Sequence, residues 1–317
     1  MCSYCDLWQK YKVIVMKLLV HADDLGNSKA ISDNILDCFG PELPLSGTSI
    51  MANGYAFDYA AKAFNQLEGN YRLAVHINLM EGPACLAADE IPLLVDEQGY
   101  FRHSFQSLLG AYYGSSKNRT AIAVQVKAEM RAQIKVVADY LPAGSLLHID
   151  GHQHFHMIPF IFKLLIQLHQ EFPIGYIRIA REPFFLHLKS KGIFNYIGLN
   201  IVKHLLLNFL AKKCFKMLQG TGIKSPDYFI GVLFTGNITI DSIHKALTVL
   251  EEKHPDQDLV VEVLMHPGGA DKAEIDLWQK YPHLVDYYCS GYRRSEKALL
   301  KNPALAQMLK GFERESS

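Results

Sequence analysis

The sequence has no excess of charge of either sign, and this restricts the partners that it can attract. Its 317 residues contain 32 Lys and Arg and 32 Asp and Glu, so the formal net charge is zero. A chain that binds nucleic acid normally carries a basic patch or stripe. We therefore expect no nucleic-acid partner.

The cysteines do not form the sequence patterns that are typical of disulfide-rich or metal-binding proteins. The six cysteines are scattered, and only Cys2 and Cys5 lie close together. Because no C-x-x-C pair is repeated, the pattern favours neither a zinc ribbon nor a disulfide framework. We expect a reducing compartment, and therefore a cytoplasmic location.

Long hydrophobic runs are also missing. The start, MCSYCDLWQKYK, lacks the regions of a secretory signal, and VIVMKLLV is too short to cross a bilayer. Residues 193–215 are apolar but contain Asn, Lys and His, and their spacing favours an amphipathic helix packed on a core. A role at a membrane surface and the burial of a homodimer face are the alternatives for this helix. We expect no stable insertion into a membrane.

The sequence does contain a regular alternation of strand and helix patterns from Lys17 onward. The predicted strands are KLLVHA, GTSIMA, RLAVHIN, SLLHID, GYIRIA, DYFIGV and LVVEVLMH. The predicted helices cover about 28–39, 55–67, 120–140, 158–171, 193–218 and 240–253, and 79–118 is expected to be irregular. This alternation predicts an α/β protein with a parallel sheet, and about seven repeats favour a TIM-like (β/α) barrel, distorted from the eight-stranded form.

The domain organisation follows from the same pattern. We predict a single domain over residues 17–317, after an amino-terminal extension over residues 1–16. The stretch DLWQKY occurs at 6–11 and again at 276–281, and it contains both tryptophans. One short repeated stretch does not indicate a repeat protein, and the sequence gives no physical account of it.

Polar residues gather at the carboxyl ends of the predicted strands, where barrels of this kind place their active sites. In chain order they are Asp23, Asp24, Asn53, His76, Asn78, His148, Asp150, His152, His154, His156, Arg178, Arg181, Glu182 and His266. Any one of them has an ordinary structural explanation. Their common position at the strand ends predicts a site at the barrel mouth.

The pair Asp23 and Asp24 in HADDLG suggests the chemistry of that site. Adjacent side chains on an extended strand point in different directions. One carboxylate can therefore bind a metal while the other acts as general base. The simpler alternative is a helix start, with Ser28 as the cap.

Histidine side chains would supply the remaining metal ligands. One His of the stretch HIDGHQHFHMIP, together with His76 and one aspartate, supplies two nitrogens and one oxygen and leaves a position open for water. A His-rich loop without a metal is the alternative. His266 lies in a loop rich in Gly and Pro, and a His with a pKa near neutrality can protonate a leaving amine. Base, metal and acid together indicate hydrolysis of an acyl bond.

Four ordered stretches, spread from residue 16 to about 270, resemble the YdjC family of carbohydrate deacetylases, which includes the chitooligosaccharide deacetylases. They are MKLLVHADDLG, VHINLMEGP, HIDGHQHFHMIP and VEVLMHPGG. The resemblance implies a (β/α) barrel related to the polysaccharide deacetylases. It also implies one divalent metal and removal of an N-acetyl group from an amino sugar or chitooligosaccharide.

The resemblance also assigns roles to single residues. It implies that Asp24, His76 and His152 bind the metal, that Asp23 is the base and that His266 is the acid. The expected substrate contacts are Asn53, His154, His156 and Arg181. A turn role for Asn53, a place behind the ligands for His154 and His156, and an Arg181–Glu182 ion pair are the alternatives.

The metal and the reaction each leave an alternative open. Two imidazoles and a carboxylate suit zinc or another transition ion, whereas the resemblance implies magnesium, which prefers oxygen ligands. A phosphoesterase would need a second metal and more carboxylates than the strand ends offer. A non-catalytic sugar-binding protein is the remaining alternative.

Overall fold

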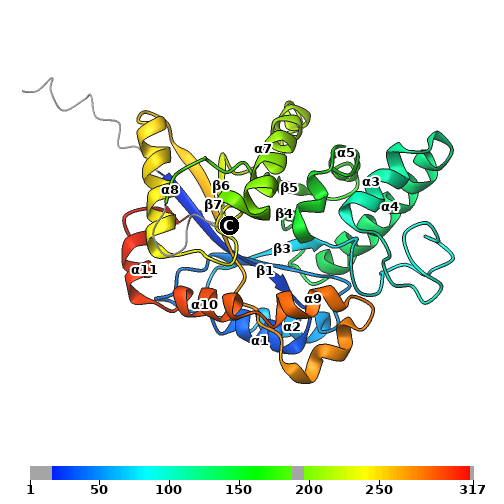
Figure 1. Cartoon of the computed structure of the whole chain (residues 1–317), viewed down its shortest axis with the longest axis horizontal. Coiled ribbons are helices and arrows are strands. Elements are labelled where there is room, and N and C mark those ends of the chain that lie inside the picture. The colour runs from blue at the N-terminus through cyan, green and yellow to red at the C-terminus, as the bar shows by residue number, and fades with distance from the viewer. Residues whose placement is uncertain (1–15, 188–195, 315–317) are drawn as a thin grey trace, which may run out of the picture.

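Seven parallel strands form one curled sheet in the computed structural model, which describes residues 16–187 and 196–314 (Figure 1). The strands are β1 (Met16–Leu25), β2 (Gly47–Ile50), β3 (Arg72–Ile77), β4 (Leu147–Gly151), β5 (Ile174–Ile177), β6 (Tyr228–Ile230) and β7 (Leu259–Met265). Their order is β5-β4-β3-β2-β1-β7-β6, and the short strand β8 (Glu313–Arg314) pairs with β1. The predicted parallel sheet is confirmed.

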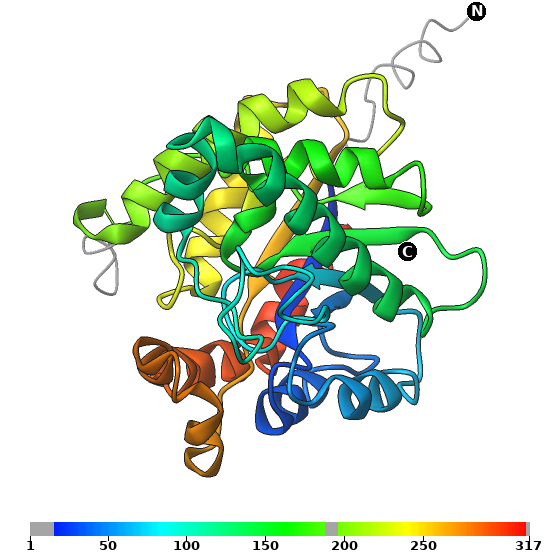
Figure 2. The same cartoon turned by 90° about the vertical axis from the view of Figure 1, so that its right-hand side faces the viewer.

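The helices lie on the outside of the curled sheet (Figure 2). They are α1 (Lys29–Leu36), α2 (Phe57–Phe64), α3 (Phe105–Tyr113), α4 (Ser116–Ala138), α5 (Pro159–Leu168), α7 (Leu199–Leu218), α8 (Ile240–Lys253), α9 (Pro282–Tyr288), α10 (Gly291–Leu300) and α11 (Pro303–Leu309). Two 3-10 helices, η1 (His152–Met157) and η2 (Lys272–Trp278), complete the set. No helix in the described part of the chain is long and apolar enough to cross a membrane.

The expected distortion of the barrel lies between β5 and β6. These two edge strands share no ladder, and an isolated bridge between Tyr176 and Lys224 connects this region. A backbone hydrogen bond of 2.8 Å runs from Phe229 N to Arg181 O. The sheet is therefore a curled half-barrel that approaches closure without completing it.

Some elements differ from the sequence expectations. Within the stretch 79–118, expected to be irregular, α3 begins at a capping box formed by Ser104 and Ser107. The carboxyl-terminal elements η2, α9, α10 and α11 were not predicted, because their helices are short and lack a long apolar period. Residues 1–15 of the extension expected at 1–16, which include the first copy of DLWQKY, and the start of the helix expected at 193 lie outside the described residues, whereas Met16 begins β1.

The two faces of the strands have different compositions. Leu18, Val20 and Ala22 of β1 belong to the hydrophobic core, and the alternation of a strand turns His21 and Asp23 to the other side. The facing positions of β4, β5 and β7 also carry buried polar residues, among them Asp150, Tyr176 and Glu262. The concave side of the sheet is therefore polar, whereas aliphatic side chains fill most barrels of this type.

Candidate functional site

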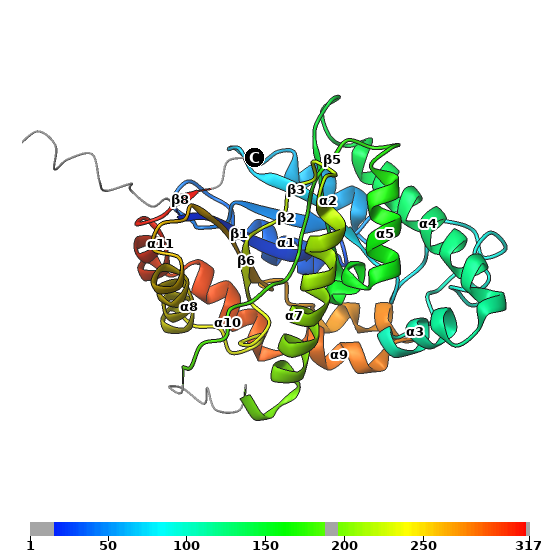
Figure 3. The same ribbon diagram turned by 90° about the horizontal axis from the view of Figure 1, so that it is seen from above.

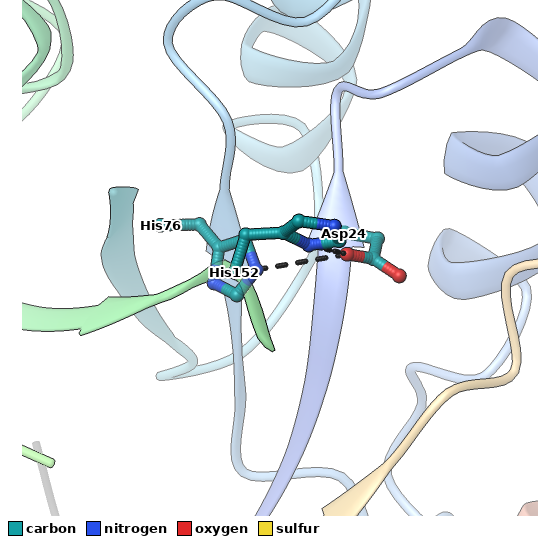
Figure 4. Close-up of side chains that lie close together, drawn as sticks. All are labelled: Asp24, His76 and His152. Carbon is teal, nitrogen blue, oxygen red and sulfur yellow. Dashed lines mark hydrogen bonds and ion pairs between the residues drawn. The ribbon is translucent and has the colours of Figure 1, made fainter. Parts of the chain in front are cut away.

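Three buried side chains from three strand ends face one another (Figure 4). Asp24 comes from the end of β1, His76 from β3, and His152 directly follows β4. His152 Nδ1 lies 3.1 Å from Asp24 Oδ1, and His76 Nε2 lies 3.6 Å from the same oxygen. One ligand atom from each residue lies within 4.8 Å of the other two. This trio is the one expected from the sequence.

The backbone of β1 explains how adjacent aspartates take different positions. The register of β1 against β2 shifts between Ala22 and Leu25, and Asp24 has a φ of 76°. A non-glycine residue in this left-handed region is uncommon, and such strain concentrates at functional sites. The irregularity turns Asp24 toward the two imidazoles, whereas Asp23 points to the concave side of the sheet.

Each imidazole of the trio also contacts a carboxylate on its far side. His76 Nδ1 donates a 2.6 Å hydrogen bond to Asp150 Oδ1. His152 Nε2 lies 3.0 Å from Glu81 Oε1. A carboxylate on one ring nitrogen orients the ring and fixes its tautomer, leaving the other nitrogen free to bind a metal. Both rings are therefore oriented with one nitrogen toward Asp24, where a bound cation would replace the proton on that nitrogen.

The carboxyl-terminal elements hold this arrangement from behind. Arg293 of α10 donates from Nη2 to Asp24 Oδ2 at 2.8 Å and from Nη1 to the carbonyl of Gly268 at 2.6 Å. Trp278 Nε1 donates to Glu81 Oε2 at 3.1 Å, and the Tyr288 hydroxyl donates to Glu81 Oε1. The second copy of DLWQKY thus supplies a residue that orients a side chain beside His152.

Sequence reasoning missed Arg293, Trp278, Tyr288 and Glu81 as parts of the site. Glu81 stands inside one of the quoted stretches, VHINLMEGP, and Trp278 stands in the repeated hexapeptide. For these two residues, the sequence therefore contains a signal that could have identified them. Nothing in the sequence near Arg293 or Tyr288 signals a contact with residues more than 200 positions away.

Asp23 is held by a guanidinium group. Arg178, which is fully buried, donates from Nη1 and Nη2 to the two oxygens of Asp23 at 2.8 and 2.9 Å. It also contacts Asp150 Oδ2 at 2.8 Å and Glu262 Oε1 at 2.6 Å. Burial acts to raise the pKa of Asp23, but the charge of Arg178 outweighs it and holds this pKa well below its usual range. Asp23 is therefore ionised at neutral pH.

The charge around the trio suits a cation. More carboxyl groups than guanidinium groups surround it: Asp23, Asp24, Glu81, Asp150 and Glu262 against Arg178 and Arg293. Burial lowers the pKa of His76, but Asp150 and Asp23 raise it to about 10. Burial likewise lowers the pKa of His152, but hydrogen bonds to Asp24 and Glu81 raise it to about 9. The residues present thus fit a divalent cation, which would supply the positive charge that this position favours.

A second group of metal-type side chains lies nearby, and a guanidinium group already occupies it. His21, Asp23 and Asp150 lie close enough together to share an ion. However, Arg178 contacts both of these carboxylates at 2.8 Å. Burial, followed by the charge of Arg178, lowers the pKa of His21 to about 3. This group is therefore paired with Arg178 and does not form a second cation site.

His266 lies closer to solvent than the trio. Its side chain is 16% exposed, and its Nδ1 lies 3.9 Å from Glu296 Oε2. The backbone N–H of His266 donates to the same carboxylate oxygen at 2.6 Å. Burial lowers the pKa of His266, while the charges of Glu296, Asp24 and Asp23 oppose that shift. The pKa of His266 therefore responds to the charges of the two aspartates at the end of β1.

Two of the four expected substrate contacts point into the protein. Asn53 Nδ2 donates to the carbonyl of Pro83 at 2.8 Å, which ties together the loops after β2 and β3. His156 is fully buried, and its Nε2 donates to the carbonyl of Arg178 at 2.8 Å. The ring of His156 therefore has no exposed surface in this structure, and its direct contact with a sugar stays a prediction. His154 has a φ of 59°, and its ring packs edge-on against Phe229.

The expected position of Arg181 also needs correction. Its Nε donates to the carbonyl of Asp227 at 2.7 Å, and its guanidinium lies over the ring of Tyr228. Asp227 precedes β6, so Arg181 points to the amino-terminal ends of the strands, whereas the trio lies at their carboxyl ends. The Arg181–Glu182 ion pair is not formed either, since Glu182 accepts hydrogen bonds from the backbone of residues 231–233 and contacts His204.

The contact between Glu81 and His152 leads to a prediction. Replacing Glu81 by Gln removes the negative charge that supports His152, so we expect a 10- to 100-fold loss of divalent-cation affinity. Competition with a chromophoric chelator measures it. Glu90→Gln, at an exposed carboxylate, is the matched control and should bind as the wild type does. Unchanged affinity in folded Glu81→Gln protein would contradict this role.

Comparisons with known proteins agree with this architecture. The profile of the family described as YdjC-like protein matches residues 17–311. A protein from Xenopus laevis named carbohydrate deacetylase is 26% identical over 276 residues, covering 82% of this chain and 83% of the relative. A Homo sapiens protein of the same name is 24% identical over 306 residues, covering 93% of this chain and 87% of the relative.

A solved structure supports the fold. It comes from Enterococcus faecalis V583, is described as a candidate cellobiose-phosphate cleavage protein, and superposes with a TM-score of 0.65. It is 18% identical and covers 95% of this chain and 97% of the other, so the likeness concerns the fold. The family match spans almost all of the described residues, including the trio and His266. The chain belongs to the YdjC-like protein family.

Proposed function

We propose that this protein is a metal-dependent deacetylase that removes N-acetyl groups from an acetylated amino sugar or chitooligosaccharide. The observation that carries the proposal is the convergence of Asp24, His76 and His152, with a carboxylate contacting each imidazole from behind. The ionised Asp23, and the more exposed His266 on whose pKa the charges of Asp24 and Asp23 act, support the proposal. The names of the curated relatives support an acetylated carbohydrate as the substrate class.

Asp24, His76 and His152 would hold the cation through one oxygen and two nitrogens. When bound, such a cation polarises a carbonyl oxygen and lowers the pKa of a water. The mixed donor set favours zinc or another transition ion over magnesium, which prefers oxygen ligands and keeps several waters. We therefore propose a transition ion, although the sequence resemblance implies magnesium.

The chain's own residues account for the proton transfers. Asp23 accepts a proton from the attacking water, whose oxygen forms a bond to the acetyl carbon. His266 in its protonated form then donates a proton to the amide nitrogen as the C–N bond breaks. The products are acetate and the free amine. Arg178 keeps the Asp23 carboxylate in one orientation through its two hydrogen bonds.

The site disfavours the phosphoesterase alternative. A two-metal phosphoesterase places its ions about 3.5–4 Å apart. Here the neighbouring carboxylates Asp23 and Asp150 are both paired with Arg178. The fixed guanidinium leaves one position for a cation, which favours a mechanism with a single ion.

Acetate release tests the proposal. The purified chain is treated with a chelator and incubated with N-acetylglucosamine, chitobiose and longer chitooligosaccharides, with zinc, cobalt, manganese or magnesium restored in turn. We expect acetate release only with metal, and most with a transition ion. Phosphate release from sugar phosphates without acetate release would overturn the proposal. Sugar binding without turnover in the metal-loaded chain would instead support the sugar-binding alternative.

A further inference from the structure

Helix α7 exposes an apolar face that no described part of the chain covers. Its exposed apolar residues, between 40% and 77% accessible, are Leu199, Val202, Leu205, Leu206 and Phe209. Its opposite face packs into the protein through residues that include Leu207, Leu210 and Cys214. A helix at a protein surface normally carries polar residues on its outer face. The first half of α7 instead carries large apolar residues on its outer face as well as on its packed face.

Neighbouring residues enlarge this surface. Phe184, Leu186 and Ile197 are 50%, 60% and 72% exposed. We call these three residues and the five on α7 the α7 patch. Scattered apolar residues are ordinary on a surface, but a contiguous group of large ones marks an interaction site.

The α7 patch lies at the same edge of the sheet as the metal-binding trio. Asn200 Nδ2 donates to the carbonyls of Leu233 and Thr235, which follow β6. His204 Nδ1 lies 3.0 Å from Glu182, which follows β5. These contacts fix the first half of α7 at the carboxyl ends of the strands, and α7 projects beyond the sheet there (Figure 3).

The charge of α7 indicates what covers the patch. The helix carries four exposed lysines and no acidic residue: Lys203, Lys212, Lys213 and Lys216. At 3.6 residues per turn, Lys212 and Lys216 continue the line of Leu205, and Lys213 continues that of Phe209. Lys213 Nζ also lies 4.6 Å from the centre of the Phe209 ring. The outer face is thus mainly apolar in its first half, where Lys203 is the one lysine, and cationic in its second half.

We propose that the α7 patch docks onto the surface of a membrane containing anionic lipids. The apolar half enters the boundary between headgroups and acyl chains, and the lysines remain at the level of the lipid phosphates. A second copy of the chain fits less well. A two-fold interface through α7 would bring two cationic helices together without an acidic residue on either helix to pair them. This inference is independent of the chemistry at the metal centre.

Vesicle cosedimentation tests this proposal with the full chain. Vesicles of phosphatidylglycerol and phosphatidylcholine in equal parts are compared with vesicles of phosphatidylcholine alone. We expect the wild type to sediment with the anionic vesicles. In Leu205→Asp/Phe209→Asp we expect partitioning to fall at least about tenfold, since two apolar anchors are lost. In Lys212→Glu/Lys213→Glu we expect a similar fall on anionic vesicles.

The matched control is Val124→Asp. Val124 is 62% exposed on α4, outside the α7 patch, so this variant should bind vesicles as the wild type does. Circular dichroism and thermal melting establish that each variant is folded. Sedimentation equilibrium without lipid measures the oligomeric state of the wild type and of each variant. Wild-type protein that stays in the supernatant with anionic vesicles, or a dimer that Leu205→Asp/Phe209→Asp dissociates, would overturn the proposal.

Discussion

Asp23→Asn protein should bind its cation as the wild type does and turn over about 100- to 10,000-fold more slowly. The amide keeps the volume of the side chain but does not accept a proton at neutral pH. The trio of Asp24, His76 and His152 does not include Asp23, so its ligand atoms stay in place. Steady-state acetate release and metal content, measured on the same preparation, check the two halves of the prediction.

The matched control for this variant is Asp33→Asn. Asp33 is a carboxylate on α1 whose side chain is 44% exposed, and its contacts are Lys29 and Tyr59 rather than residues of the trio. We expect this control to keep full turnover. An Asp23→Asn variant that retains near wild-type turnover would show that another group takes the proton, and the assignment of the base would be wrong.

Arg178→Met should be among the most destabilising single changes in this chain. Arg178 forms ion pairs with three buried acidic side chains from three strands: Asp23 of β1, Asp150 of β4 and Glu262 of β7. Removing one member of a buried ion pair leaves a charge without a partner and costs about 3–5 kcal/mol. We expect a loss of at least this size in the free energy of unfolding, measured by denaturant titration of the metal-loaded protein.

An exposed arginine provides the comparison. Arg131 pairs with Glu171 at 2.6 Å, and its side chain is 47% exposed. Surface pairs of this kind contribute about 0–1 kcal/mol. Arg131→Met should therefore change the free energy of unfolding by no more than that. If the two variants lost similar stability, the role of Arg178 as the shared counter-charge would be refuted.

The sheet and the position of the site at its carboxyl ends were predictable because both follow from local patterns, whereas the choice of Asp24 and His152 from among their neighbours rests on the family resemblance. Alternating strands and helices imply a parallel sheet, and the carboxyl ends of parallel strands meet at one edge. Residues Asp24, His76 and His152 stand at three such ends, and the irregular backbone of β1 at Asp24 then turns its carboxylate toward the two imidazoles. Helix α8 was predicted with the bounds that the structure has, since its apolar period is regular.

The supporting residues were not predictable in the same way. Arg178 lies near the end of the predicted strand GYIRIA and Arg181 follows it, and the sequence does not show which side of the sheet each reaches. The structure places Arg178 on the concave side against Asp23 and sends Arg181 to Asp227 at the opposite edge. Arg293 reaches Asp24 through the packing of α10, which depends on tertiary contacts that a local pattern does not encode.

The central claim is that Asp24, His76 and His152 hold the single catalytic cation. Its most direct test is a zinc titration of the chelator-treated protein, with acetate release followed at each addition for the wild type and for His152→Ala. We expect wild-type activity to rise in proportion to zinc and to stop rising at one equivalent per chain, and the folded variant to stay inactive. Full activity before any zinc is added, or a variant that matches the wild type, would contradict the claim.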